Sequence, residues 1–415
     1  MARASVTFPR PRIADVAGEV RRRLEELSPP RLAGRRIAVT AGSRGIRDIV
    51  PVLAAAVAWI REQGGDPVIV GAMGSHGGGT EEGQRRLLAH LGITPERVGA
   101  PVLTSMETVE LGTTPRGLIA YCDRNAVACD GILVVNRIKP HTAFAEPFGS
   151  GLLKMIAVGL GKAPAAAQIH RQGPAEMGAA IESIAAVALT TRRILGGLAI
   201  IENAFDETAR IAGVPPDAMP REERALFAEA RALMPSLPVD ALDVLIVDEV
   251  GKNYSGTGMD VNVVGRWRLP GMAEPAAPAI QRIVALRLSP ESEGNAQGIG
   301  LADVVTRALV DAIDPVATYV NTLVSTYVQR AFVPVTMPTD RDAVEAALAS
   351  LNLPDPAAAR VVRIPNTLHL EECEVSESLI PELQTHPRVT VGSAEPMSFS
   401  DDGGLRRFEA RGPSP

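Results

Sequence analysis

The sequence has 415 residues, of which 46% are hydrophobic and 22% are charged. This composition excludes a disordered chain, and the length favours two or more domains of about 100–200 residues each. Lys and Arg together number 42 against 48 Asp and Glu, which gives a net charge of −6. Without a global basic field, nucleic acid is not an expected partner.

The cysteines and the apolar segments indicate the compartment. Three cysteines, none of them in a Cys-x-x-Cys pair, exclude a disulfide framework and a zinc ribbon and indicate a reducing environment. The N-terminus lacks the apolar segment of a signal peptide, and no window approaches about 18 uninterrupted apolar residues. We therefore expect a cytoplasmic protein without a membrane partner.

In the first half of the chain, short β-rich runs alternate with amphipathic helices. Strands are predicted at 36–40, 67–70, 131–135 and 198–201, and helices at 48–61, 80–91 and 175–190. Alternation of this kind predicts a largely parallel sheet with helices layered on it.

A second α/β pattern begins after the Pro-containing stretch 234–238. Its predicted strands are 244–248, 283–288 and 359–364, and its predicted helices are 301–313, 340–351 and 376–383. The expected fold class is therefore α/β, with two α/β domains, residues 1–240 and 241–415, built on largely parallel layered sheets. We expect an active-site cleft between the two domains.

Two of the six histidines follow predicted strands. His76 lies in GSHGGGT, between a strand and a helix N-terminus, and His141 ends the run NRIKPH after the buried strand 131–135. Open α/β sheets bind their ligands at these strand ends. His170 has polar neighbours and lies sixteen residues after Lys154.

The loops around these strands contain candidate anion ligands. Gly77–Gly79 lets backbone amides approach a phosphate or carboxylate at a helix N-terminus, and the alternative is a flexible loop with an exposed histidine. Arg44 follows the first strand and has the fork geometry that holds a carboxylate or phosphate, unless it is an ordinary surface arginine.

Two further segments carry basic residues in unusual surroundings. Lys154 lies in the apolar, glycine-rich stretch 149–161. A buried charged amine is costly there, so it is paired or chemically modified, or else its side chain extends to water. Lys252 and Arg266 belong to the polar run GKNYSGTGMDVNVVGR, which follows a strand and has the composition of either a ligand-binding loop or a surface loop.

Together these motifs resemble the nickel-pincer-nucleotide-dependent lactate racemase family over most of the chain. The segments that carry the resemblance are GSHGGGTEE at 74–82, NRIKPH at 136–141, Lys154 with His170, GKNYSGTGMDVNVVGR at 251–266 and NTLHLEECEVSESL at 366–379.

The resemblance implies a racemase or epimerase that acts on a 2-hydroxy acid by proton-coupled hydride transfer to a nickel-pincer nucleotide. Lys154 matches the lysine that carries this cofactor covalently, and His170 matches the nickel ligand. His76 and His141 match the acid–base pair. The other implied site residues are Ser43, Gly77 and Gly78 for the cofactor and Arg44, Lys252 and Arg266 for the substrate. Proteins that synthesise the cofactor are implied partners.

The sequence also departs from the family pattern. Ala41 stands where the early loop usually carries an aspartate, the stretch from His141 to Lys154 is longer around 145–147, and Arg268 competes with Lys252 and Arg266 for the substrate role. These differences predict a 2-hydroxy acid that is longer or more polar than lactate.

Two alternatives remain open from the sequence. One is a zinc-dependent hydrolase that uses His76, His141 and His170, although no HExxH spacing supports it. The other is a non-catalytic nucleotide- or anion-binding protein.

Overall fold

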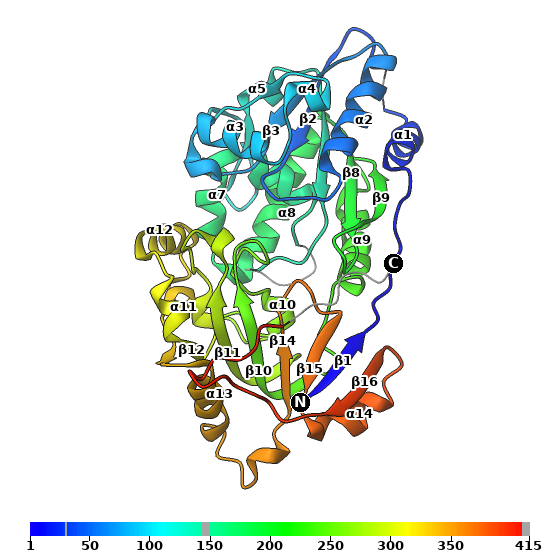
Figure 1. Ribbon diagram of the computed structural model, residues 1–415. Helices are drawn as coiled ribbons and strands as arrows, with labels where there is room; N and C mark the ends of the chain where they lie inside the picture. Colours follow the sequence, from blue (N-terminus) through cyan, green and yellow to red (C-terminus); the bar gives the residue numbers. More distant parts are fainter. Residues whose placement is uncertain (30, 143–148, 409–415) are drawn as a thin grey trace. The chain divides into compact units, whose positions relative to one another are not determined.

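The computed structural model describes residues 1–29, 31–142 and 149–408, and the chain forms two compact units. The first unit is Arg10–Met234, and the second combines Met1–Pro9 with Pro235–Pro415 (Figure 1). The expected domains, 1–240 and 241–415, differ from this division mainly at the N-terminus. There, strand β1 (Ala2–Val6) pairs with β15 (Glu372–Val375) and β16 (Val389–Ala394) of the second unit.

The first unit is built on a six-stranded sheet in the order β4-β3-β2-β7-β8-β9, in which only β9 is antiparallel. The strands are β2 (Arg36–Ala41), β3 (Asp66–Gly71), β4 (Val102–Leu103), β7 (Gly131–Arg137), β8 (Ile194–Glu202) and β9 (Thr208–Val214). The chain runs outward from β2 through β3 to β4 and returns on the other side of β2 with β7. This reversal places the topological switch point, where such sheets bind ligands, between β2 and β7.

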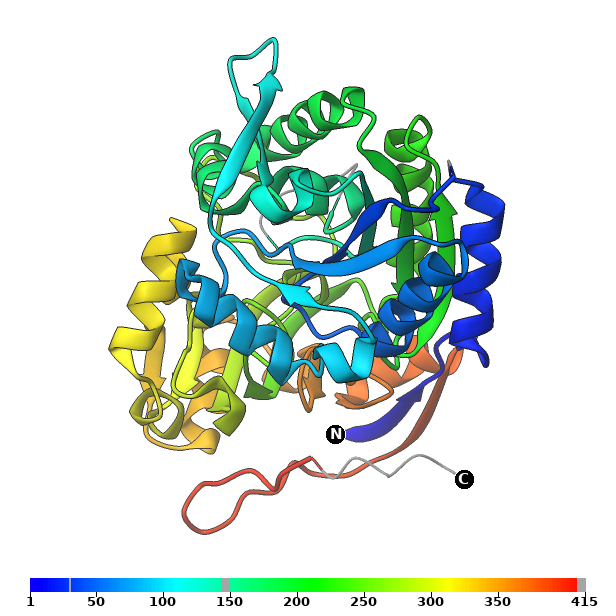
Figure 2. The same cartoon turned by 90° about the horizontal axis from the view of Figure 1, so that it is seen from above.

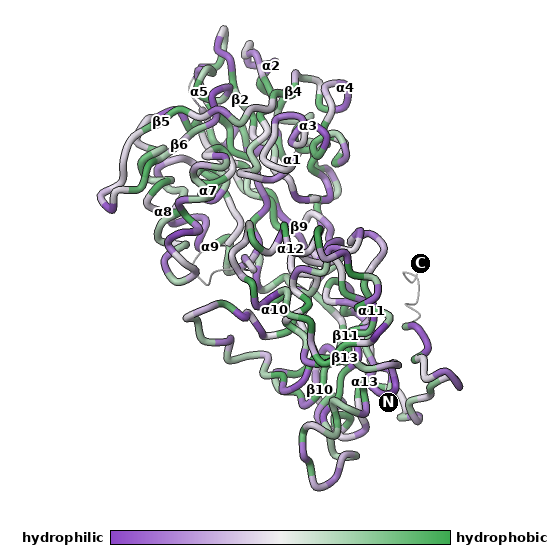
Figure 3. Tube along the Cα trace, turned by 90° about the vertical axis from the view of Figure 1, so that its left-hand side faces the viewer, coloured by the Kyte–Doolittle hydropathy of each residue, from purple (hydrophilic) through white to green (hydrophobic). Residues whose placement is uncertain are grey.

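Helices cover both faces of this sheet, so its strands are apolar on both sides. Alternate strand residues such as Val39 and Leu133 belong to one apolar cluster, and Ala38 and Val134 belong to another. Figure 3 colours the chain around β2 largely green, for hydrophobic residues. The helices of the unit are α1 (Val16–Leu27), α2 (Ile49–Glu62), α3 (Glu81–His90), α4 (Pro95–Val98), α5 (Arg124–Val127), α6 (Leu152–Lys154), α7 (Lys162–His170), α8 (Pro174–Thr190) and α9 (Met219–Ala232). A hairpin of β5 (Thr108–Thr113) and β6 (Ile119–Asp123) projects from the unit in Figure 2.

The second unit has an eight-stranded sheet in the order β13-β12-β11-β10-β14-β15-β1-β16. Five strands are parallel: β10 (Ala241–Val250), β11 (Ala279–Leu288), β12 (Val304–Thr306), β13 (Val335–Met337) and β14 (Val361–Ile364). Its helices are α10 (Val261–Val264), α11 (Arg307–Asp311), α12 (Pro315–Ser325), α13 (Asp340–Ala349) and α14 (Ile380–Gln384). The predicted fold class, two α/β units with largely parallel sheets, is confirmed.

One predicted element is wrong. The segment 301–313 does not form a single helix, because Val304 and Val305 pair with β11 and β13 as strand β12. Thr306 then caps α11 by accepting a hydrogen bond from Leu309 N. The β-branched pair favours the strand, and the capping threonine sets where the helix begins.

Among the described residues, no single helix is long and apolar enough to cross a membrane, although one bent pair of segments, Leu152–Gly159 with Lys162–His170, meets the length and composition criterion.

Candidate active site

Three of the predicted site residues follow neighbouring strands of the first unit. Arg44 comes after β2, His76 after β3 and His141 after β7, and β2 lies between the other two strands. The carboxyl ends of parallel strands meet at one edge of a sheet, so these loops emerge together at the switch point.

Thr40 marks the place where β2 and β7 separate. Backbone pairing between these strands ends at Val39↔Leu133. Beyond it, the Thr40 hydroxyl accepts a hydrogen bond from Val135 N at 2.8 Å and donates one to Val135 O at 3.2 Å. A side chain therefore replaces the main-chain ladder, and the strand ends diverge.

Lys154 and His170 lie at the two ends of a sharply bent helical segment. A π-helical turn, Met155–Gly159, follows α6, with Leu160 N donating to Met155 O five residues earlier at 2.9 Å. The chain then bends by 106° into α7. Gly161 permits this corner, because a Cβ there would lie 2.4 Å from Ala157 O. π-Helical turns such as Met155–Gly159 are frequent at functional sites.

The Lys154 amine is half-buried and has no hydrogen-bond or ion-pair partner among the residues that the structure describes. Desolvation, and then the charge of Arg44, lowers its pKa to about 7. The amine is therefore largely neutral at slightly alkaline pH, and a neutral amine is a nucleophile.

His76 is held by Ser43, whose Oγ lies 2.5 Å from Nδ1 of the imidazole. The His76 side chain reaches solvent, yet desolvation and the charges of Arg44, Lys154 and His170 lower its pKa to about 4. Its imidazole is therefore neutral near pH 7 and able to accept a proton. Ser43, which the resemblance assigned to the cofactor, is in contact with the proposed base.

His170 belongs to the same electrostatic group. Its pKa is lowered by desolvation and by the charge of Lys154, which shows that the bend brings the two ends of the segment into electrostatic reach. The Nδ1 atom of His170 is buried and has no hydrogen-bond partner among residues 1–29, 31–142 and 149–408. A buried polar atom without a partner in a native structure points to a ligand that completes it.

Arg44 completes a positive cluster at this edge. Desolvation and the neighbouring Arg137 lower its pKa, and no carboxylate in the described part of the chain pairs with it. Arg137 is paired with Glu202, which also accepts a hydrogen bond from Arg47 N at 2.8 Å. This pair fixes the loop that carries Arg44 and leaves Arg44 available for an anion.

The sequence reasoning missed Arg137 and Glu202. Arg137 lies inside the NRIKPH motif, but Glu202 is 65 residues further along the chain, and only the parallel pairing of β7 with β8 brings the two together.

The three glycines after His76 differ in their roles. All have positive φ. Gly77 is required for packing, because a Cβ there would lie 2.6 Å from Gln84 N. A Cβ on Gly78 or Gly79 would have no atom of the described residues within 4 Å. The open side of the loop is thus at Gly78, where a ligand can approach the backbone.

His141 is half-buried and follows the bridge between Lys139 and Ser150. Its role as partner of His76 stays a prediction. The longer stretch predicted around 145–147 lies outside the described residues.

The basic residues predicted in the second unit have partners of their own. Lys252 Nζ donates to Gly256 O at 2.8 Å and to Asn321 Oδ1 at 2.6 Å, next to the end of β10. Arg266 is buried and donates to Asp303 Oδ2 at 2.6 Å and to Leu301 O at 2.9 Å. These contacts favour a structural role for Arg266.

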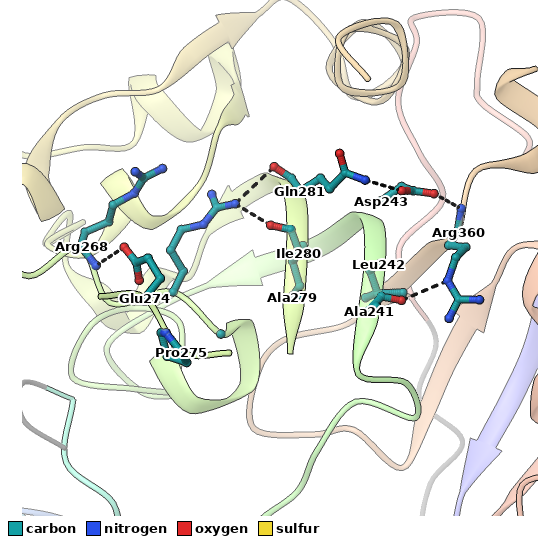
Figure 4. A pocket seen from close by; sticks show the side chains of 12 residues that line it. Ala241, Leu242, Asp243, Arg268, Glu274, Pro275, Ala279, Ile280, Gln281 and Arg360 are labelled. Atoms are coloured by element: carbon teal, nitrogen blue, oxygen red, sulfur yellow. Dashed lines mark hydrogen bonds between the residues drawn. The ribbon is translucent and has the colours of Figure 1, made fainter. Parts of the chain in front are cut away.

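A cavity of about 480 Å³ in the second unit lies at the amino ends of β10 and β11 (Figure 4). Arg266, Arg268 and Arg360 line it together with Asp243 and Glu274. Asp243 and Glu274 accept hydrogen bonds from the backbone N–H groups of Arg360 and Arg268, and the three arginines form ion pairs with Asp303 and Glu382. The cavity lies at the sheet edge opposite to the loop that carries Lys252. The cavity therefore does not include the loop that carries Lys252.

The donor set fits the cofactor that the resemblance implies better than it fits a metal ion alone. Residues 1–29, 31–142 and 149–408 contain no group of three His, Cys, Asp or Glu side chains that could hold a metal ion. This finding gives no support to a zinc site made of His76, His141 and His170. Among the described residues, a lysine without a partner and with a lowered pKa, and an imidazole with an unpartnered buried nitrogen, do fit a covalent group that brings its own metal ligands.

The lowered pKa of Lys154 can be measured directly. In the cofactor-free protein, trace acetylation of Lys154 as a function of pH is expected to be half-maximal near pH 7, because the site disfavours the charged amine. Peptide mass spectrometry separates the lysines for this purpose. A midpoint near 10.5, the ordinary value for lysine, would show that the amine is solvated instead.

The fold and the site define a class of protein: a two-unit α/β protein whose polar site, rich in His, Lys and Arg, lies at the switch point of a doubly wound sheet. Residues 40–181 match the model of the lactate racemase N-terminal domain. The match begins at the end of β2 and includes β3, β7 and the Lys154–His170 segment. It confirms, over these residues, the resemblance to the lactate racemase family that the sequence motifs indicated.

Comparison with solved structures agrees in fold. The lactate racemase apoprotein from Thermoanaerobacterium thermosaccharolyticum is similar with a TM-score of 0.54 and 13% sequence identity, over 88% of this chain and 98% of that one. No curated protein sequence matches the chain.

Proposed function

We propose that this protein racemises or epimerises a 2-hydroxy acid with the help of a nickel-pincer nucleotide attached covalently to Lys154. The observation that carries the proposal is the Lys154 amine, which has a pKa of about 7 and no partner in the described part of the chain. It lies in the same positive cluster as His76 and His170. Forming an amide-type bond removes the charge that this site disfavours, so attachment relieves a cost that the free amine imposes.

His170 would supply a nickel ligand. Imidazole is a suitable ligand for nickel, and the electrostatic contact between His170 and Lys154 supports a metal held near the attachment point. Because the chain offers no cluster of three ligands among its described residues, the remaining donors would come from the cofactor itself.

When bound, the cofactor supplies a carbon that can accept a hydride from the substrate and return it. The residues of the chain bind the substrate and move its proton. Arg44 would hold the carboxylate and so orient the 2-hydroxy group. His76, neutral and fixed by Ser43, would take the hydroxyl proton.

Two bases are needed because the enantiomers present their hydroxyl groups on opposite sides. His141, which follows the neighbouring strand β7, is the second base in this proposal. Proteins that make the cofactor would be required partners. Ala41, in place of the usual aspartate, supports a substrate other than lactate.

Deuterium labelling tests this function. Protein produced together with the cofactor-synthesis proteins is incubated in H2O with a panel of 2-hydroxy acids deuterated at the α-carbon. We expect the opposite enantiomer to form with its deuterium retained, because a transferred hydride does not exchange with water. Protein made without the synthesis proteins is the control and should be inactive. Loss of the label to solvent, or zinc-dependent hydrolysis without a nucleotide adduct, would contradict the proposal.

A further inference from the structure

Lysine is rare in this chain. Of the 42 Lys and Arg residues, only four are lysines, at positions 139, 154, 162 and 252. Arginine fills almost every other basic position, and the two side chains are not interchangeable, because lysine has a compact head and arginine a planar fork. Lys162 has no exposed surface, and the function proposed above does not use it.

The ammonium group of Lys162 lies among three oxygens. It donates to Gly71 O, at the end of β3, and to Gln84 Oε1 at 2.9 Å, and it forms an ion pair with Asp123 Oδ2 at 3.0 Å. A compact head with three donors fits this arrangement, whereas the planar fork of arginine does not.

The backbone of Lys162 is itself unusual. Its φ is +54°, in the left-handed region, at the first residue of α7 after the Gly161 corner. This conformation is unfavourable for a non-glycine residue and persists only where the surrounding contacts hold it. The buried contacts of the side chain provide that restraint.

Gln84 connects Lys162 to the loop of His76 through hydrogen bonds. Its Oε1 is used by Lys162, and its Nε2 donates to Gly74 O at 2.9 Å and to His76 O at 3.3 Å. The Gln84 side chain is fully buried in α3. One amide group thus binds Lys162 on one side and two carbonyls of the loop on the other.

The loop also contacts the Lys154–His170 segment directly. Gly74 N donates to Gly159 O at 3.1 Å. A Cβ on Gly159 would lie 2.7 Å from Ala72 O, so the two backbones are in close contact.

We infer that Lys162 and Gln84 are positioning residues, which lock the loop of His76 onto the segment that carries Lys154 and His170. The inference rests on the proposed role of His76 as a proton acceptor. Neither side chain is exposed, so neither can touch a substrate. They act by holding the His76 imidazole at a fixed place beside Lys154. This placement matters because a base must lie within hydrogen-bond distance of the proton that it accepts.

The test uses Gln84→Leu, which removes both sets of hydrogen bonds with little change in volume. Gln168→Leu is the matched control: Gln168 is also a buried glutamine, but its amide bonds to Ile119 N and O in β6 and not to the loop. Both variants and the wild type are titrated by NMR as cofactor-free proteins, with the His76 signal assigned through His76→Gln.

In Gln84→Leu, the pKa of His76 is expected to rise from about 4 by about one unit or more, since the loosened loop moves the ring away from desolvation and positive charge. In Gln168→Leu it should stay at the wild-type value, even if both variants lose similar thermal stability. Lys162→Met should shift the His76 pKa in the same direction. If Lys162→Met does not fold, the His76 pKa in Gln84→Leu alone tests the positioning role.

An unchanged His76 pKa in Gln84→Leu would overturn the inference, and so would an equal shift in the Gln168→Leu control. These readouts need no cofactor, so they stand even if the proposed function fails. With loaded enzyme, kcat of Gln84→Leu should fall about tenfold or more at unchanged cofactor content, whereas loss of the cofactor would contradict a role in placing His76.

Discussion

Lys154→Ala is expected to lose all covalent cofactor, and racemisation with it, because the variant has no amine at the end of α6 to form the bond. Lys154→Arg should fail in the same way, since it keeps a charge but not a nucleophilic amine. Intact-protein mass spectrometry and nickel analysis of co-expressed protein give the readout. Lys139→Ala, a lysine replacement in the same unit, should keep the full mass increment. An adduct retained in Lys154→Ala would show that the anchor is elsewhere.

The cost of the Lys154 charge to folding is tested separately, by the pH dependence of stability. The folded-state pKa of Lys154 is about 7 against an ordinary 10.5, so between these values the unfolded chain binds more protons and stability rises with pH. Below pH 7 the charged amine lowers the free energy of unfolding by its full amount, and above pH 10.5, where the amine is neutral in both states, it has no effect. Cofactor-free Lys154→Met should therefore unfold at a higher temperature than the wild type at pH 6, and the difference should shrink as the pH approaches 10. An equal gain at every pH would show that the charge is not the cause.

His76→Ala is expected to keep the cofactor and to lose about 10²–10⁴-fold in kcat, the usual contribution of a positioned acid–base group. The matched control is His90→Ala, an exposed histidine at the end of α3, which should behave as wild type. Because the His76 pKa is lowered to about 4, its base form is present throughout pH 5–8, and wild-type kcat/KM should not lose this base until the pH approaches 4. Wild-type turnover in His76→Ala would remove this residue from the mechanism.

The local pattern of the sequence predicted four strands and three helices of the first unit correctly, and it did not predict α1, α9 or β9. The runs at 36–40, 67–70 and 131–135 are strands because they are apolar on both faces, and the histidine and arginine that follow them lie at one sheet edge because parallel strands end together. The same reasoning failed at 301–313, where pairing with two neighbouring strands outweighed the helical spacing.

The features that the sequence did not predict depend on contacts between distant residues. Gln84 has the pattern of an ordinary helix residue, and its contact with Lys162 joins positions 78 residues apart. The pairing of β1 with β15 and β16 joins the two ends of the chain. The scarcity of lysine is visible in the sequence and distinguishes Lys162 from the many arginines, but it does not indicate which side chains surround the amine.

The most direct measurement is peptide mapping of the matured wild-type protein, combined with metal analysis of the same sample. The proposal predicts one nickel per chain and a nucleotide-sized mass increment on the peptide that contains Lys154. Matured protein that interconverts enantiomers of a 2-hydroxy acid while its Lys154 peptide keeps the unmodified mass would contradict it.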